Sequence, residues 1–212
     1  MSDTGFGDFE FERKFVVDEL PAALREEPSP ALIVQSYFLA AEGYALRVRL
    51  QAPAPAGSLD EGVDAERLLE EVDFTFCALT VKGPYVGGTR YEAERELDVS
   101  VGRAMVRLGG HRIVKHRYSL WLGTDGWVID AFLGANSPLV VAECERGGPV
   151  TDLAIPDFCV TEVSDDPRFA NDALAVRPYS AWGRDFEEEL AARGPRFLQH
   201  FGTNETGVRS DR

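Results

Sequence analysis

Seven segments of this chain alternate charged residues with apolar residues, and this pattern limits the folds that the sequence can adopt. In "FEFERKFVV" (9–17), Glu10, Glu12 and Lys14 share one face of an extended strand, because successive side chains of a strand point to opposite faces. Phenylalanines dominate the other face. The pattern predicts antiparallel sheets whose strands each have one ionic and one apolar face.

Further segments have strand character, and most are separated by turn residues. They cover residues 31–40, 44–52, 73–83, 89–99, 112–122, 126–132 and 138–146. Helical spacing is found in 18–26, 100–109 and 181–194. We interpret 53–72 as an insertion in a hairpin. The order of elements predicts an α+β fold, mainly antiparallel β, and leaves a barrel and a sandwich both open.

The length of 212 residues fits one main domain with an appended piece. We expect this domain over 1–180, with the 53–72 insertion inside it. A C-terminal helix and tail are expected over 181–212, with the last residues, 202–212, frayed.

The balance of charge argues against two classes of partner. A net charge of −14 would repel both a nucleic acid and an anionic membrane. The three cysteines form no C-x-x-C pair, so neither a zinc site nor a disulfide framework is predicted. No signal-peptide pattern or long apolar run is present, and we therefore expect a cytoplasmic protein.

The charges on the strands are segregated by sign. Acidic pairs stand in "EFE", "EAE" and "ECE", and basic pairs stand in "RVR" and "KHR". For any single strand, the simplest interpretation is a charged face exposed to water. Taken together, clustered carboxylates repel one another unless cations intervene, and clustered cations require an anion.

One ligand combination satisfies both groups: a divalent metal ion on the carboxylates that bridges to a polyanion on the basic residues. Carboxylate oxygens suit Mg²⁺ or Mn²⁺, and the scarcity of histidine, with three in the whole chain, argues against zinc. Arginine and lysine suit a chain of phosphates. No G-x-x-x-x-G-K-[ST] loop is present, so side chains would hold the phosphates.

The segment "EFERKF" is similar to the E-x-E-x-K signature of the CYTH superfamily, also called triphosphate tunnel metalloenzymes. The resemblance continues, in the family's order, over roughly 8–176 without the insertion. The further blocks are "QSYF", "LRVRL", "TVKGP", "TRYEAERE", "VKHRY", "IDAFLG", "VAECE" and "EVSDDPRFANDALA".

The resemblance implies an eight-stranded closed β-barrel, a tunnel with a hydrophilic charged interior and flanking helices. It also implies divalent-metal-dependent hydrolysis of a small triphosphate, with inorganic triphosphate ahead of thiamine or nucleoside triphosphates. An adenylate cyclase of the same fold and a non-catalytic polyphosphate- or nucleotide-binding module remain alternatives. The resemblance leaves a monomer and a homodimer both open.

The resemblance also implies roles for individual residues. The implied metal ligands are Glu10, Glu12, Glu143, Glu145 and Asp130. The implied binding residues for the triphosphate are Lys14, Arg47, Arg49, Lys82, Arg90, Lys115 and Arg117. Glu92 and Glu94 would hold a second metal or orient water, and together with Lys14 they are the expected catalytic residues. Tyr37 matches a family tyrosine and could equally be a packed aromatic residue.

The sequence departs from the family pattern at Thr161. Several members carry a lysine at this place, on a segment that plugs one end of the tunnel. Arg168 and Arg177 could compensate for the missing charge, although each is more simply explained as a surface arginine.

Overall fold

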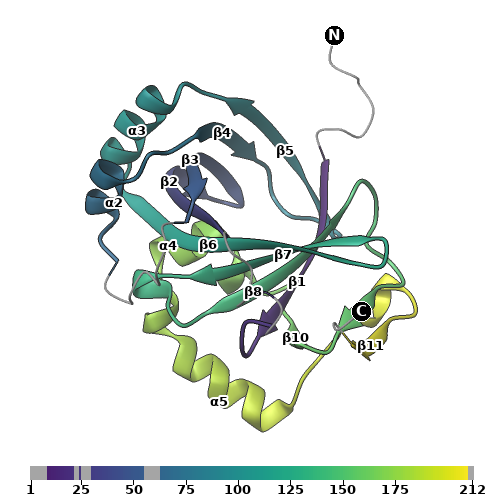
Figure 1. Ribbon diagram of the computed structural model, residues 1–212. Helices are drawn as coiled ribbons and strands as arrows, with labels where there is room; N and C mark the ends of the chain where they lie inside the picture. Colours follow the sequence, from purple (N-terminus) through teal and green to yellow (C-terminus); the bar gives the residue numbers. More distant parts are fainter. Residues whose placement is uncertain (1–8, 22–23, 25–29, 55–62, 210–212) are drawn as a thin grey trace.

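The computed structural model describes residues 9–21, 24, 30–54 and 63–209. Eight antiparallel strands form a closed barrel in the order β1-β5-β4-β3-β2-β6-β7-β8, and β8 pairs back with β1 (Figure 1). The strands are β1 (Phe9–Val17), β2 (Ala31–Ala41), β3 (Tyr44–Pro53), β4 (Phe76–Lys82), β5 (Thr89–Glu96), β6 (His111–Leu122), β7 (Asp125–Phe132) and β8 (Val140–Arg146). The predicted barrel is therefore confirmed, and the sandwich is excluded.

Tight turns fix the register of the hairpins. Glu42 and Gly43 join β2 to β3 with φ angles of 52° and 81°, a conformation that matches the right-handed twist of the flanking strands. Gly123, with φ at 60°, lies in the turn between β6 and β7. The eight predicted strands agree with the observed ones to within a few residues at each end.

The ionic faces of the strands point into the barrel. Residues that pair directly across two strands lie on the same face, and Glu12 pairs with Glu145 while Glu10 pairs with Arg90. Charged faces exposed to bulk water, the simplest interpretation of each strand alone, are thus not what the chain adopts. Closure of the sheet brings these faces together around one interior.

One helix covers the apolar outer face of β3 and β4, and a second helix packs beside it and adds to the same apolar cluster. These are, in this order, α3 (Val99–Leu108) and α2 (Ala65–Glu71), which lie side by side on the barrel in Figure 1. The carboxylate of Asp98 caps α3 by accepting from the backbone N–H groups of Ser100 and Val101. A Cβ at Gly102 would lie 2.0 Å from the Cys77 sulfur, so a glycine is required for this close approach.

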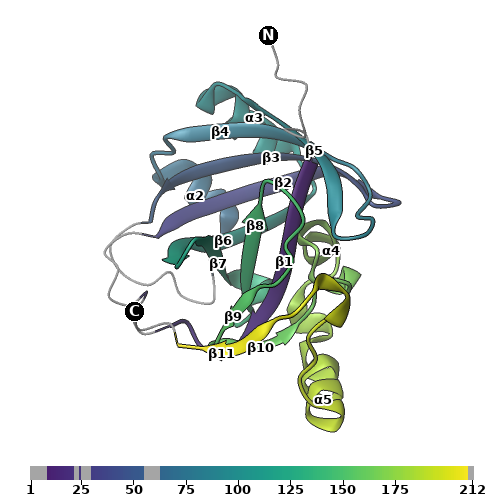
Figure 2. The ribbon, with the colours of Figure 1, turned by 90° about the vertical axis from the view of Figure 1, so that its right-hand side faces the viewer.

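A second apolar cluster lies outside β1, β7 and β8, around Phe15 and Trp127. It is covered by β9 (Ala154–Pro156), β10 (Cys159–Glu162) and the C-terminal segment. The strand β11 (Glu205–Val208) pairs in parallel with β9, as Figure 2 shows below β1. The prediction of a frayed tail from residue 202 is therefore wrong for residues 205–208.

A buried ion pair joins this C-terminal segment to the barrel. The Arg13 guanidinium donates to both carboxylate oxygens of Glu162, at 2.8 and 2.7 Å, and to Asn204 Oδ1 at 2.7 Å. The side chains of Arg13 and Glu162 are fully buried. Glu162 also accepts from the backbone N–H of Leu198 at 2.8 Å.

A third cluster closes one end of the barrel. At this end the inward-facing positions change from charged to apolar residues, among them Tyr37, Ile113, Phe132 and Val141. They pack against residues that follow β10, including Phe169 and the side chains of two helices. The helices are α4 (Asn171–Val176) and α5 (Gly183–Arg193). We call this cluster the apolar plug.

Several elements lie outside the sequence expectations. The strands β9, β10 and β11 and the helix α4 were not predicted, and neither were the 3-10 turns. The latter are η2 (Gly134–Asn136), η3 (Pro167–Phe169), η4 (Tyr179–Ala181) and η5 (Gln199–Phe201). The helix predicted over 18–26 is wrong for residues 18–21, which are not helical, and residues 22–23 and 25–26 lie outside the described residues. Part of the 53–72 insertion, in which α2 is described, also lies outside them. The assignment of 1–180 as one domain stays a prediction.

None of the helices in the described ranges has the length and apolar character that crossing a bilayer would require.

The Arg13–Glu162 pair predicts a large loss of stability on truncation. Arg13→Met should lower the free energy of unfolding by about 3 kcal/mol or more, because Glu162 would keep a buried charge without its cation. Urea denaturation measures this loss. The control is Arg184→Ala, because Arg184 pairs with Glu188 on the surface of α5, and its loss should change the free energy by about 0.5 kcal/mol or less. Equal stabilities of the two variants would contradict the account.

Candidate functional site

The barrel interior holds a cavity of about 220 Å³, which we call the tunnel cavity. All the predicted site residues except Lys115 and Asp130 line it. The lining comprises Glu10, Glu12, Lys14, Arg47, Arg49, Lys82, Arg90, Glu92, Glu94, Arg117, Val128, Glu143, Glu145 and Asn171. Residues that are more than a hundred positions apart in the sequence therefore meet in one space.

One ionic network joins β1, β4 and β5 across the cavity. Lys82 Nζ lies 2.9 Å from a Glu10 carboxylate oxygen and 2.7 Å from one of Glu92. Arg90 Nε donates to the same Glu10 carboxylate at 2.9 Å. Burial alone would raise the pKa of Glu10, but Lys82 and Arg90 hold it well below its usual range. Glu10 is therefore ionised at neutral pH.

A second network joins β1 to β8. Lys14 Nζ donates to Glu12 at 3.0 Å and to Glu143 at 2.6 Å. Burial would lower the pKa of Lys14, but these two carboxylates raise it above its usual value. Lys14 is thus a fixed cation between two of the predicted metal ligands.

Two arginines of β3 contact the acids of β5. Arg49 donates to both carboxylate oxygens of Glu94 at 3.0 Å, and Arg47 Nη2 lies 3.5 Å from Glu92. The Nε atoms of Arg47 and Arg49 are buried and have no hydrogen-bond partner among the described residues. Burial and the neighbouring Arg47 lower the pKa of Arg49. Two guanidinium groups that line the cavity thus each have one N–H donor without a hydrogen-bond partner among the described residues.

Lys115 and Asp130 share the inward face of their strands with Arg117 but do not line the tunnel cavity. Asp130 is almost fully buried; it accepts from Lys115 Nζ at 2.6 Å and from Arg117 Nε at 2.8 Å. Burial would raise the pKa of Asp130, but these cations hold it below its usual value. The metal role predicted for Asp130 gains no support from this placement, which instead orients Arg117 toward the cavity.

Glu145 lies on the exposed side of the cavity, in a cluster of acids. Partial burial raises its pKa to about 7, together with the charges of nearby carboxylates. These carboxylates are Glu10, Glu12, Glu92 and Glu143. A cation placed among them would relieve this repulsion.

The carboxylates of β1 and β8 have the right chemistry for a hard divalent cation, but in this structure they are not grouped around a single point. Four carboxylates on the adjacent strands β1 and β8 form an all-oxygen donor set of the kind that Mg²⁺ and Mn²⁺ prefer. Over the part of the chain that the structure describes, no three acidic, histidine or cysteine side chains are grouped closely enough to hold a metal ion. Glu10, Glu12 and Glu143 are instead paired with Lys14, Lys82, Arg90 and Arg117.

A second cavity, of about 470 Å³, is in contact with the tunnel cavity at shared residues of the barrel wall. Glu12, Lys14 and Arg90 line both cavities. The contact arises because one edge of β1 pairs with β5 through Phe11 and with β10 from Phe15 onward, which leaves a gap between the two pairings. In this gap, the Tyr85 hydroxyl and the Ser164 side chain satisfy the backbone groups of β1. Sequence patterns gave no indication of this opening.

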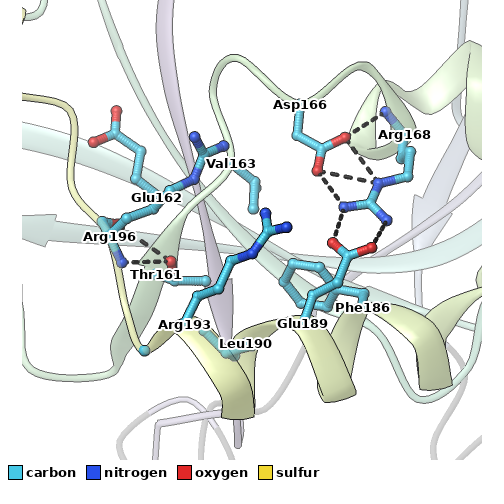
Figure 3. A pocket seen from close by; sticks show the side chains of 11 residues that line it. Thr161, Glu162, Val163, Asp166, Arg168, Phe186, Glu189, Leu190, Arg193 and Arg196 are labelled. Carbon is cyan, nitrogen blue, oxygen red and sulfur yellow. Dashed lines mark hydrogen bonds and ion pairs between the residues drawn. The ribbon is translucent and has the colours of Figure 1, made fainter.

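Thr161, which stands where several family members have a lysine, does not line the tunnel cavity, and neither do Arg168 and Arg177. Thr161 Oγ1 donates to the backbone carbonyl of Arg196 at 3.2 Å and accepts from its N–H at 3.0 Å. Figure 3 shows Arg168 held between Asp166 and Glu189, with Nη2 at 2.8 and 3.0 Å from their oxygens. Arg177 is exposed. Neither arginine replaces a charge in the tunnel cavity.

Two other residues complete the description. Tyr37 is buried in the apolar plug, and its hydroxyl accepts from Gln35 Nε2 at 3.1 Å. Asn171 of α4 lines the tunnel cavity, although sequence reasoning gave it no role. A single uncharged polar residue belongs to no periodic pattern in the sequence. Its position in the cavity could therefore be seen only in the folded structure.

Comparisons with known proteins give one likeness in sequence. No family model matches the chain. A stretch of 103 residues is 36% identical to a protein of Acetivibrio thermocellus named inorganic triphosphatase, and it spans 48% of this chain and 66% of that protein. The match thus covers slightly less than two thirds of the relative's length.

Solved structures give a likeness in fold. The crystal structure of the inorganic triphosphatase NE1496 matches 79% of this chain and 94% of its own chain, with a TM-score of 0.51 and 26% identity. A second crystal structure, of the hypothetical protein NE1496, gives a TM-score of 0.50 and 27% identity over 79% and 97% of the two chains. Together with the sequence match, these likenesses confirm the resemblance to the triphosphate tunnel metalloenzymes that the order of the sequence blocks predicts.

Proposed function

We propose that this protein hydrolyses a small triphosphate in its tunnel cavity, with a divalent metal ion as cofactor and inorganic triphosphate as the first candidate substrate. The observation that carries the proposal is the enclosure of opposite charges in one cavity. The curated relative and the solved structure named above, both called inorganic triphosphatases, support the choice of substrate.

The basic residues account for the binding of a phosphate chain. Arg47, Arg49, Lys82, Arg90 and Arg117 face the cavity from four strands. Guanidinium groups bind phosphate oxygens through paired hydrogen bonds, and the Nε groups of Arg47 and Arg49, which are buried and lack a partner among the described residues, could become donors to phosphate when these side chains leave their carboxylate partners. Bound phosphates would replace the carboxylates as partners of these cations.

The carboxylates released by this exchange account for the metal. We assign Glu10, Glu12, Glu143 and Glu145 as its ligands, and Mg²⁺ or Mn²⁺ as the ion. Such an ion, when bound, neutralises phosphate charge and polarises the phosphorus–oxygen bond that breaks. Lys14 would move from Glu12 and Glu143 to a phosphate oxygen, because the metal would take its two carboxylate partners.

The acids of β5 are placed to act on water. In hydrolysis, a water oxygen attacks the terminal phosphorus, the bond to the bridging oxygen breaks, and orthophosphate and diphosphate leave. Burial, together with the charge of Glu10, raises the pKa of Glu92 despite its contact with Lys82, which favours Glu92 as an acceptor of the water proton. Glu94 would orient the water. The cations around the cavity would stabilise the charge that develops on the leaving group.

A cytoplasmic location is part of the proposal. It is supported by the three cysteines, which are free and buried, so that the fold uses no disulfide among them.

Hydrolysis assays test the proposal. Purified protein should release phosphate from inorganic triphosphate in Mg²⁺ or Mn²⁺ and should lose this activity in EDTA. Glu145→Gln should lower kcat/KM about 100-fold or more, because a metal ligand is lost. The control is Glu188→Gln, an exposed residue of α5, which should leave activity unchanged.

Other products would identify the alternatives. Cyclic AMP formed from ATP would indicate a cyclase, and triphosphate binding without phosphate release would indicate a binding module. Thiamine triphosphate and ATP, assayed alongside inorganic triphosphate, establish the preferred substrate.

The acid cluster also predicts a pH effect on stability without metal. The pKa of Glu145 is about 7 in the folded protein, above its ordinary 4.5, so the folded state binds this proton more tightly than the unfolded state. The stabilisation is complete below pH 4.5 and is lost as the pH rises through 7. Glu145→Gln should therefore raise Tm relative to the wild type at pH 8 more than at pH 4.5, by differential scanning fluorimetry in EDTA. A Tm difference that is the same at both pH values would contradict the crowding of carboxylates.

A further inference from the structure

Asn171 differs in origin from the other residues of the tunnel cavity. Of the described residues that line it, Asn171 is the one that lies outside the barrel strands. It begins α4, which contacts β2 and β6 and appears within the ring of strands in Figure 1. The C-terminal part of the chain therefore contributes one polar side chain to the cavity.

The surrounding structure holds Asn171 firmly. Leu174, one turn further along α4, is fully buried in the apolar plug. The carbonyl of Leu174 accepts from Asn136 Nδ2 at 3.3 Å, and Asn136 Oδ1 accepts from the backbone N–H of Tyr179 at 2.8 Å. These contacts fix α4 at the closed end of the barrel.

The orientation of the Asn171 amide follows from its neighbour. Lys115 Nζ donates to Asn171 Oδ1 at 3.1 Å, and an ammonium group has donors but no acceptor. The amide must therefore turn its oxygen toward Lys115. Its NH₂ group has no hydrogen-bond partner among the described residues and remains available to the tunnel cavity.

We propose that Asn171 donates a hydrogen bond from Nδ2 to the phosphoryl group at the plugged end of the tunnel cavity. This inference rests on the proposed function, because it requires a phosphate chain in the cavity. Asn171 then contacts the substrate from the plug, at the end where the expected family lysine is replaced by Thr161. The same side chain also positions Lys115 through Oδ1.

Three variants separate the contact with phosphate from the positioning of Lys115. Asn171→Asp keeps an acceptor for Lys115 but replaces the NH₂ donor with a negatively charged oxygen. Asn171→Ala removes both functions. The matched control is Ser180→Asp, which adds the same charge at an exposed residue of η4. Aspartate is favourable in the first turn of a helix, so Asn171→Asp should fold.

The measurements are the Kd of inorganic triphosphate by calorimetry in EDTA, and kcat and KM in Mg²⁺. EDTA prevents the new carboxylate from acting through a metal ion. We expect Asn171→Asp to weaken binding about tenfold or more, and at least as strongly as Asn171→Ala, because a charge-assisted hydrogen bond is replaced by repulsion. Ser180→Asp should bind like the wild type.

The outcomes distinguish the two proposals. In one outcome, Asn171→Asp binds triphosphate as well as the wild type does, and Asn171→Ala binds it more weakly. This result would show that Asn171 acts through Lys115 alone, and it would overturn the proposed contact with phosphate. Equal binding by all variants overturns both roles of Asn171 but leaves the proposed function intact. A wild type that neither binds nor hydrolyses inorganic triphosphate overturns the proposed function, and this inference with it.

Discussion

The enclosure of charges of both signs inside the barrel is the constraint on which the rest of the structure depends. A charge that leaves water without a partner is strongly destabilising, so each enclosed side chain needs an opposite charge nearby. Pairing across strands supplies it, as Lys82 does for Glu10 and Glu92. Under the proposed function, phosphate would take the place of carboxylate, and a metal ion the place of ammonium, each with a charge of the same sign.

The ionic interior also explains where the apolar residues of the molecule lie. Since the inner faces are ionic, the core lies outside the barrel, in the cluster under α2 and α3 and in the cluster covered by β9 and β10. At one end the inner faces become apolar, and the plug formed with α4 and α5 closes the tunnel there. The gap beside β1 brings a second cavity against three of the same charged residues, Glu12, Lys14 and Arg90.

The strands could be predicted from the sequence because alternation is a local signal. The inward direction of Glu12 or Arg49 could not, because the period of two is the same for either orientation; the ordered resemblance to a family supplied the direction. Arg13 shows the limit most clearly. It shares the apolar face of β1 with Phe11 and Phe15. An arginine on this face is explained only by its buried ion pair with Glu162, which lies 149 residues away in the sequence.

The site was predictable where charges repeat and was missed where a single residue acts. The cavity gathers nearly all the charged residues named in advance, because each belongs to a recognisable pair or block. The hydrogen bonds that Asp130 accepts from Lys115 and Arg117 had no sequence signal, and the position of Asn171 depends on the packing of α4. Such roles depend on distances between segments, which no local pattern contains.

Anomalous diffraction at the manganese edge tests the central claim most directly. In crystals soaked with Mn²⁺ and inorganic triphosphate, the account predicts an anomalous peak inside the barrel beside the carboxylates of Glu10, Glu12, Glu143 and Glu145. Phosphate density should extend from this peak toward Arg47 and Arg49. Manganese bound elsewhere, with the ion pairs of Lys14 and Lys82 unchanged and the tunnel cavity free of phosphate, would contradict it.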